Sequence, residues 1–192
     1  MRNGDPVTAA TIRRAEPDDA RAIAEVRIGA WRATYRGMIP DAYLDAMKVE
    51  DSEALWRRVL GAAPNTTSVF VAVDDGRVVG FASGMMLGAP RFGLDAELNA
   101  IYVQAGHQRT GIGRRLVQAV VGAQRAVGAT GVLTWVIAQN REARKFYEVL
   151  GGELLVEQPF QWDGMDLVEA GYGWRDLDAL AAACASASTT QQ

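Results

Sequence analysis

A short glycine-bearing segment, QRTGIG at residues 108–113, constrains the fold of this 192-residue chain more than any other feature. It lies between the apolar stretch 96–103, which predicts a strand, and the amphipathic stretch 111–127, which predicts a long helix. The first turn of a helix leaves backbone N–H groups without a partner, and the helix dipole favours negative charge there. Glycines let an anion approach those groups closely. The junction therefore predicts a phosphate-binding site.

The glycines alone are open to other interpretations. A single Gly-x-Gly pair often does no more than shape a turn. A dinucleotide-binding fold would need a third glycine where Leu116 stands, and a Walker A loop would need a Gly-Lys-Ser/Thr sequence, which is absent. The flanking strand and helix, with Arg109, Arg114 and Arg115 close by, favour the phosphate site.

The other elements are predicted from apolar periodicity and turn residues. The best local signal is a hairpin, in which Asp74-Asp75-Gly76 joins two apolar strands. Residues 88–93, which include Pro90, predict a loop. In the helix expected after residue 53, Leu55 and Val59 are the expected inward residues, and Val127 ends the apolar stripe of the long helix. We also expect a strand at 12–13, helices after Pro17, after Pro40 and at 140–150, and strands at 132–138, 153–157 and 165–174.

Length and composition favour one domain with its own core, because 49% of the residues are hydrophobic. We expect this domain to cover residues 11–178. Residues 1–10 and 179–192 are expected to be flexible, since the C-terminal stretch consists of small and polar residues that anchor little against a core. Cys184 falls in this expected tail.

The charge balance and the scarcity of metal-binding side chains narrow the class of protein. With 20 basic and 23 acidic residues the net charge is -3, which provides no basic field for nucleic acid. The single cysteine and the single histidine predict neither an internal disulfide nor a zinc site, so we expect no metal. No apolar run suits a signal peptide or a membrane span, so we expect a cytoplasmic protein without a membrane partner.

Two segments together resemble a known superfamily. Residues 97–116, ELNAIYVQAGHQRTGIGRRL, resemble the acyl-CoA-binding core of the GNAT N-acyltransferases, and residues 140–152, NREARKFYEVLGG, resemble that family's second signature. The resemblance implies an α+β, three-layer fold. Its central sheet is mostly antiparallel, splayed between the fourth and fifth strands and flanked by helices. It also implies acetyl-CoA as cosubstrate, with the pantetheine arm in the gap of the sheet. The loop departs from the family pattern at Ala105-Gly106, where a proline is frequent.

The resemblance further implies which residues hold the coenzyme. The backbone of one strand would contact the pantetheine arm, and the glycine segment would hold the diphosphate. Carried onto this sequence, the coenzyme-binding residues are Ile101, Tyr102, Val103, Gln108, Arg109, Thr110, Gly111, Ile112, Gly113, Arg114 and Asn140.

Glu97 is the candidate base for the acceptor amine. An alkylammonium with a pKa near ~10 must lose a proton before it attacks a thioester, and a carboxylate, directly or through water, can accept that proton. Strand alternation places Glu97, Asn99, Ile101 and Val103 on one face, with Leu98, Ala100 and Tyr102 on the other. The alternative is a glutamate that is merely solvated or paired with an arginine.

Tyr147 is the candidate acid for the departing thiolate. Helical spacing places Asn140, Arg144 and Tyr147 on one face, while Phe146 packs inward with Ala143 and Leu150. The alternatives are a half-buried tyrosine with a solvated hydroxyl and an Asn140 that only caps its helix. The aromatic residues Trp31, Tyr35, Trp56 and Trp162 are assigned no role, because aromatics at such spacing usually belong to the core.

The resulting functional prediction is an N-acetyltransferase. It would move an acetyl group from acetyl-CoA to a primary amine of a small molecule or a peptide, within a ternary complex and without a covalent enzyme intermediate. The Val103 N–H would polarise the thioester carbonyl, as the resemblance implies. Two alternatives stay open: a non-catalytic acyl-CoA-binding module, and an enzyme that acetylates protein N-termini or lysines. A homodimer also stays open.

Overall fold

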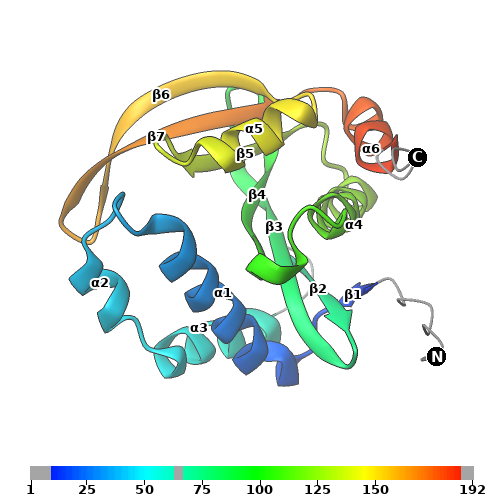
Figure 1. The fold of residues 1–192 in the computed structure, drawn as a ribbon. Coiled ribbons are helices and arrows are strands. Elements are labelled where there is room, and N and C mark those ends of the chain that lie inside the picture. The colour runs from blue at the N-terminus through cyan, green and yellow to red at the C-terminus, as the bar shows by residue number, and fades with distance from the viewer. Residues whose placement is uncertain (1–9, 63–66, 187–192) are drawn as a thin grey trace, which may run out of the picture.

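The computed structural model describes residues 10–62 and 67–186 (Figure 1). In chain order the elements are β1 Thr11–Arg14, the short 3-10 helix η1 Pro17–Asp19, α1 Ala20–Tyr35, α2 Asp41–Ala46, α3 Val49–Gly61, β2 Thr67–Asp74, β3 Arg77–Arg91, β4 Leu94–Val103, η2 Ala105–His107, α4 Ile112–Ala126, β5 Val132–Ile137, α5 Arg141–Val149, β6 Glu153–Trp162, β7 Met165–Trp174 and α6 Leu177–Ala185.

A seven-stranded sheet in the order β1-β2-β3-β4-β5-β7-β6 forms the centre of the molecule. All neighbouring strands are antiparallel except β4 and β5, which run parallel. These two strands pair at one end only, where Ala96 lies opposite Val132 and Glu97 opposite Leu133, and they then diverge (Figure 1). The predicted mostly antiparallel sheet, splayed between its fourth and fifth strands, is confirmed.

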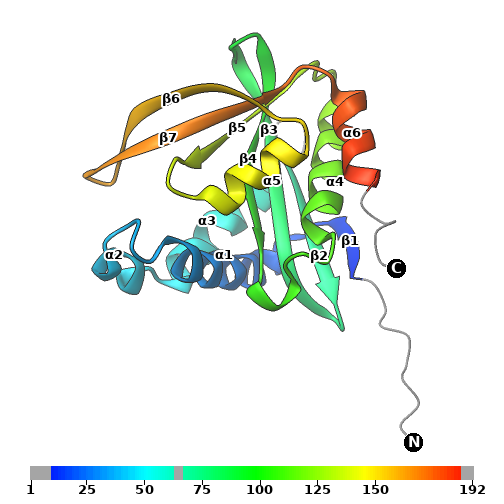
Figure 2. The same cartoon turned by 45° about the horizontal axis from the view of Figure 1, so that its top comes forward.

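Helices cover both faces of the sheet and complete three layers. Helices α4 and α6 lie side by side on one face, while α1 and α3 cover the other (Figure 2). The core beneath α4 contains Leu116, Val120 and residues of β5 and β7, and a second core beneath α1 contains Ile23 and Phe81. No helix within residues 10–62 and 67–186 is long and apolar enough to cross a membrane.

A β-bulge in β4 makes the predicted alternation of its faces wrong. Ser83 lies opposite Ala100 and Gly84 opposite Leu98, so Asn99 is an extra residue without a partner in β3. An extra residue reverses the alternation of side chains beyond it. Leu98, Ile101 and Val103 therefore share the α4 face, and Ala100 and Tyr102 pack toward α1.

The hairpins are partly as predicted. The turn between β2 and β3 has positive φ angles at Asp75 and Gly76, which confirms the expected Asp-Gly turn. The loop predicted at residues 88–93 is wrong, since β3 continues to Arg91 and the turn follows at Phe92-Gly93. Pro90 is tolerated because it lies where the ladder between β3 and β4 is interrupted, so no N–H is needed there.

Two predictions about burial are also corrected. In α3 the inward residue is Trp56, and Leu55 is 43% exposed. Val127 is 56% exposed because α4 ends one residue earlier, at Ala126. Both errors have one cause: residue spacing locates the end of a helix and its buried face only to within a residue or two.

The tail expected from residue 179 is instead folded as far as Ser186. Helix α6 is capped by Asp176, whose side chain accepts from the backbone N–H groups of Asp178 and Ala179 at 3.0 and 2.9 Å. Leu177, Leu180 and Cys184 recur at helical spacing and are buried against α4. The small alanines between them allow close packing of the two helices. Residues 1–9 and 187–192, which were also expected to be flexible, lie outside the described part of the chain.

Candidate active site

The glycine segment forms the N-terminus of α4, as predicted. Gly111 has φ +84° and Arg109 has φ +62°, so the backbone turns sharply twice before the helix begins. The first backbone bond into the helix is donated by Arg115 N–H to the Gly111 carbonyl, at 3.2 Å. The N–H groups of Ile112, Gly113 and Arg114 donate to no acceptor among the described residues. These three amides can bind an anion.

Side chains of the preceding loop hold this turn in place. Gln108 Nε2 donates to the Val103 carbonyl at 3.1 Å, and Thr110 Oγ1 donates to the His107 carbonyl at 2.6 Å. Both side chains are exposed and bond to the loop itself. Gly113 approaches α5, where a Cβ on it would lie 3.4 Å from Phe146 Cζ. The loop between β4 and α4 is therefore braced at both ends.

Only one of the three arginines expected near the anion remains available to it. Arg109 is exposed and lies 3.5 Å from Glu142, at the start of α5. The guanidinium of Arg114 instead donates to the Ala183 carbonyl of α6 at 2.6 Å, and that of Arg115 donates to the Ala10 carbonyl. These two side chains are therefore engaged elsewhere, Arg114 by α6, which was not expected, and Arg115 by the residue before β1. The Arg114 backbone N–H still faces the turn.

Three residues of β4 were expected to contact the coenzyme through their backbone, and two of them direct their backbone N–H groups toward the gap in the sheet. Gln104 N–H donates to the Val79 carbonyl in β3 at 2.8 Å. In an antiparallel pair every second residue bonds to the neighbouring strand, so the backbone groups of Tyr102 also point toward β3. Ile101 and Val103, which alternate with them, point their N–H groups away from β3 toward the gap. Tyr102 was expected to do the same and does not. Its hydroxyl accepts from Trp31 Nε1 at 2.9 Å, on the α1 side.

Glu97 is half-buried on β4, near the point where β4 and β5 begin to diverge. Because Ala96 and Leu98 pack toward α4, Glu97 lies on the opposite face, toward α1. Burial raises the pKa of its carboxyl, the nearby Arg91 lowers it, and the carboxylate of Glu169 raises it further. A carboxylate with a raised pKa is a stronger base than a solvated one.

Phe146 packs against the core with Ala143 and Leu150, as expected, but Tyr147 is also buried there, at 5% exposure. The Tyr147 ring packs at 5.9 Å from the rings of both Tyr172 and Trp174. Burial raises its pKa to about 12, although a hydrogen bond with Thr134 opposes the shift. Thr134 in turn donates to the Leu98 carbonyl at 2.8 Å, across the point where β4 and β5 separate.

Asn140 caps α5, and its Oδ1 accepts from Ala143 N–H at 3.1 Å. Asn140 was expected to bind the coenzyme, with capping as the alternative, and its side-chain oxygen serves the cap. Its other neighbour is the buried Tyr35 of α1, whose pKa is raised by burial and by Tyr102 and lowered by a hydrogen bond with Asn140.

The aromatic residues Trp31 and Tyr35 of α1 are buried in a core cluster, as expected. Trp31 and Tyr35 pack edge to face at 5.0 Å and meet Tyr102, and Trp162 lies 5.3 Å from Trp31. The spacing of Trp31 and Tyr35 by one helical turn puts both on one face. That spacing indicates a shared face but does not distinguish a core from a site wall.

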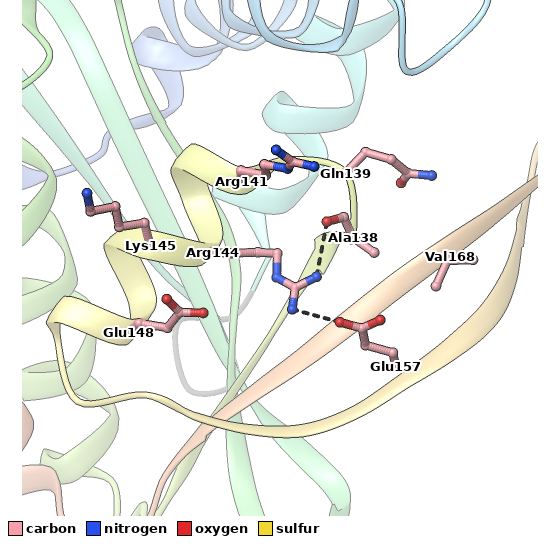
Figure 3. A pocket seen from close by; sticks show the side chains of 8 residues that line it. All are labelled: Ala138, Gln139, Arg141, Arg144, Lys145, Glu148, Glu157 and Val168. Atoms are coloured by element: carbon pink, nitrogen blue, oxygen red, sulfur yellow. Dashed lines mark hydrogen bonds and ion pairs between the residues drawn. The ribbon is translucent and has the colours of Figure 1, made fainter.

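A separate cavity of about 600 Å³ lies between α5 and the strands β6 and β7, and none of the predicted site residues lines it (Figure 3). Within the described ranges, no three side chains of the types that ligate metals come together.

The comparisons with known proteins agree with this geometry. The sequence model of the "Acetyltransferase (GNAT) family" matches residues 30–151. The uncharacterized N-acetyltransferase YuaI of Bacillus subtilis is 36% identical over 171 residues, which are 88% of this chain and 95% of YuaI.

Solved structures with the same fold include two with a bound coenzyme. The PaiA N-acetyltransferase of Thermoplasma acidophilum, in complex with coenzyme A, superposes with a TM-score of 0.68 at 20% identity over 85% of this chain and 98% of its own. YncA of Salmonella typhimurium, with acetyl-CoA, superposes with a TM-score of 0.63 at 22% identity over 88% and 94% of the two chains. At these identities the likeness concerns the fold.

Proposed function

This chain belongs to the acetyltransferase (GNAT) family, and we propose that it moves an acetyl group from acetyl-CoA to a primary amine within a ternary complex. The acceptor is an amine of a small molecule or a peptide, and the proposed location is the cytoplasm. One observation carries the proposal: the amides of Ile112, Gly113 and Arg114 have no acceptor among the described residues, and they begin the helix that follows β4, the strand that borders the gap. A diphosphate bound there leaves its attached arm facing the gap.

The coenzyme is held mainly by backbone groups. The three amides of α4, with the exposed Arg109, bind the diphosphate, because unpaired N–H groups and the helix dipole both favour an anion. The N–H groups of Ile101 and Val103 bind the pantetheine arm as an additional strand would. Two relatives of this fold carry coenzyme A or acetyl-CoA in their solved structures, which supports this choice of ligand.

The chemistry needs three groups, and the site offers one for each. Glu97, or a water that it holds, removes a proton from the ammonium, and the free amine then attacks the thioester carbonyl carbon. The carbonyl oxygen becomes an oxyanion, which the Val103 N–H stabilises. When the C–S bond breaks, the carbonyl forms again and the sulfur leaves as a thiolate, which takes a proton from the Tyr147 hydroxyl. The attacking nitrogen then gives its second proton, through water, to the tyrosinate, so the phenol is restored and a neutral amide is released. No bond to the enzyme forms at any step.

The test combines binding with turnover. Calorimetry on the full chain should show saturable binding of acetyl-CoA, and release of free thiol should follow only when an amine from a mixed panel is present. Absence of binding at millimolar acetyl-CoA would refute the proposal. Binding without thiol release for any small or peptide amine would instead indicate a non-catalytic acyl-CoA-binding module, and turnover with peptides alone would indicate a protein acetyltransferase.

A further inference from the structure

Arg144, in the middle of α5, is bonded to three different strands or strand ends. Its Nε donates to the Tyr172 hydroxyl of β7 at 3.1 Å, its Nη1 donates to the Ala138 carbonyl after β5 at 3.2 Å, and its Nη2 lies 2.7 Å from Glu157 of β6. Figure 3 shows the last two of these contacts. The guanidinium thus ties α5 to the far half of the split sheet.

Tyr172 extends this connection to the proposed acid. Its hydroxyl accepts from Arg144 and donates to Glu148 of α5 at 2.8 Å, so it bonds to α5 at two residues. The residue is fully buried, and its ring packs 5.9 Å from the ring of Tyr147. Movement of α5 relative to β7 would therefore change how the Tyr147 ring is held.

At the cavity, polar bonds connect α5 with β6 and β7, whereas on the core side of the helix Tyr147 packs on Tyr172 and Trp174 of β7. The cavity of about 600 Å³ separates the helix from the two strands. It is lined by Ala138, Gln139, Arg141, Arg144, Lys145, Glu148, Glu157 and Val168. Since few apolar side chains fill this space, the contacts of Arg144 supply the connection there. The side chain is 23% exposed, so its bonds are only partly weakened by water.

We propose that Arg144 is a positioning residue for the acetyl transfer, which fixes α5 on β7 so that the Tyr147 hydroxyl faces the gap between β4 and β5. This inference rests on the proposed function, in which Tyr147 protonates the thiolate. Arg144 touches none of the reacting groups, and its effect passes through Tyr172 and the helix. A small displacement of a catalytic group is enough to lower turnover strongly.

The experiment is a double-mutant cycle on the full chain, assayed by thiol release well below the melting temperature of every variant. R144M should lower kcat about tenfold and leave the KM for acetyl-CoA within about twofold of the wild-type value. In a Y147F background R144M should change kcat by less than about twofold, because Arg144 acts through the Tyr147 hydroxyl and that hydroxyl is already absent. R144K should not restore kcat, since an ammonium cannot reach three partners in the plane of a guanidinium.

Matched variants keep the outcome clear. R141M, on the same helix and the same cavity, should leave kcat unchanged. Should R144M fail to fold, Y172F removes the shared hydroxyl, keeps the ring and is expected to give the same pattern. Full kcat in folded R144M, or effects of R144M and Y147F that simply multiply, would overturn this inference alone. A Y147F variant with full kcat would remove the proposed acid as well.

Discussion

At the scale of single residues, burial decides what Tyr147 can do. Its pKa of about 12 means that the phenol keeps its proton throughout the neutral range. A thiol has a pKa near ~8.5, below that of this phenol, so proton transfer from Tyr147 to the thiolate is uphill by itself. The transfer becomes favourable when the attacking nitrogen loses its proton in the same step and the phenol is restored.

Tyr147→Phe tests this role directly. We expect kcat to fall about 100-fold, the lower end for removal of a positioned acid, while the KM for acetyl-CoA changes little because the ring still packs on Tyr172 and Trp174. Steady-state rates of thiol release, with melting temperature as the control, measure both. Wild-type turnover in the variant would assign the residue to the core only.

Glu97 gives a prediction about pH. Burial raises its pKa, so the base becomes available only as the pH rises above the ordinary glutamate value of about 4.3. The acidic limb of the kcat/KM profile should therefore lie above that value. Glu97→Gln should lower kcat/KM at least about 100-fold and remove this limb. An unchanged limb in the variant would mean that another group titrates.

The Glu97→Gln substitution should also change the stability of the fold, and the direction of the change follows from the raised pKa. A carboxyl whose pKa is higher in the folded than in the unfolded state destabilises the fold when it is charged. Its cost is absent below the unfolded pKa and is present in full above the raised folded pKa. Glu97→Gln should thus raise the melting temperature at neutral pH and give no gain near pH ~3.

The sequence identified these residues by type but did not give the directions of their side chains. Glu97, Tyr147 and the loop glycines follow from motif and spacing. The inward turn of Tyr147 and the contact between Arg114 and Ala183 depend on elements distant in the sequence. Tyr102 faces α1 because of one extra residue, Asn99, in its strand. Alternation rules cannot locate a bulge.

At the scale of elements, the N-terminus of α4 depends on one residue with a left-handed backbone conformation. Gly111 has φ +84°, a conformation that costs a residue with a Cβ about 1–2 kcal/mol. Gly111→Ala should therefore destabilise the protein by about that amount. It should also weaken acetyl-CoA binding, because a shifted turn misdirects amides whose bonds to a charged group are each worth about 1.5–3 kcal/mol.

Gly122 is the matched control, since it lies in the middle of the same helix with no atom near its Cβ position. Gly122→Ala should stabilise the protein by about 0.5–1 kcal/mol and leave binding unchanged. Chemical denaturation and calorimetry measure the two quantities. If both alanine variants bind acetyl-CoA like the wild type, the turn does not hold the diphosphate.

Elements with local signals were predicted well, and elements that depend on packing were not. The hairpin β2–β3, the helix α4 and the capped helix α5 carry turn residues, apolar stripes and a cap that act over a few positions. Helix α6 has an alanine-rich sequence with few large side chains, and it is ordered by burial of Leu177, Leu180 and Cys184 against α4. Composition alone made it look like a tail.

At the scale of the whole molecule, the split sheet is the property that sequence patterns could not supply. Each strand is predicted from its own residues, but the parallel pairing of β4 with β5, and its end after Glu97 and Leu133, involves two distant segments. The splay was expected only because of a family resemblance. It leaves Ile101 and Val103 without pairing to β5, on the strand that leads to α4, so we expect one extended ligand to contact these residues and the amides of α4.

Ligand binding should therefore stabilise the entire fold. At a concentration one hundred times its Kd, acetyl-CoA should add about 2.7 kcal/mol, which is a rise of about 5–10 °C in Tm for a chain of this size. Acetyl-pantetheine, which lacks the diphosphate, should give little rise at the same concentration because the three amides of α4 stay unfilled. Differential scanning fluorimetry can compare the two ligands. The rise in Tm with acetyl-CoA should persist in Tyr147→Phe and be largely lost in Gly111→Ala. Equal rises with both ligands would show that the gap in the sheet, and not the N-terminus of α4, supplies the binding energy.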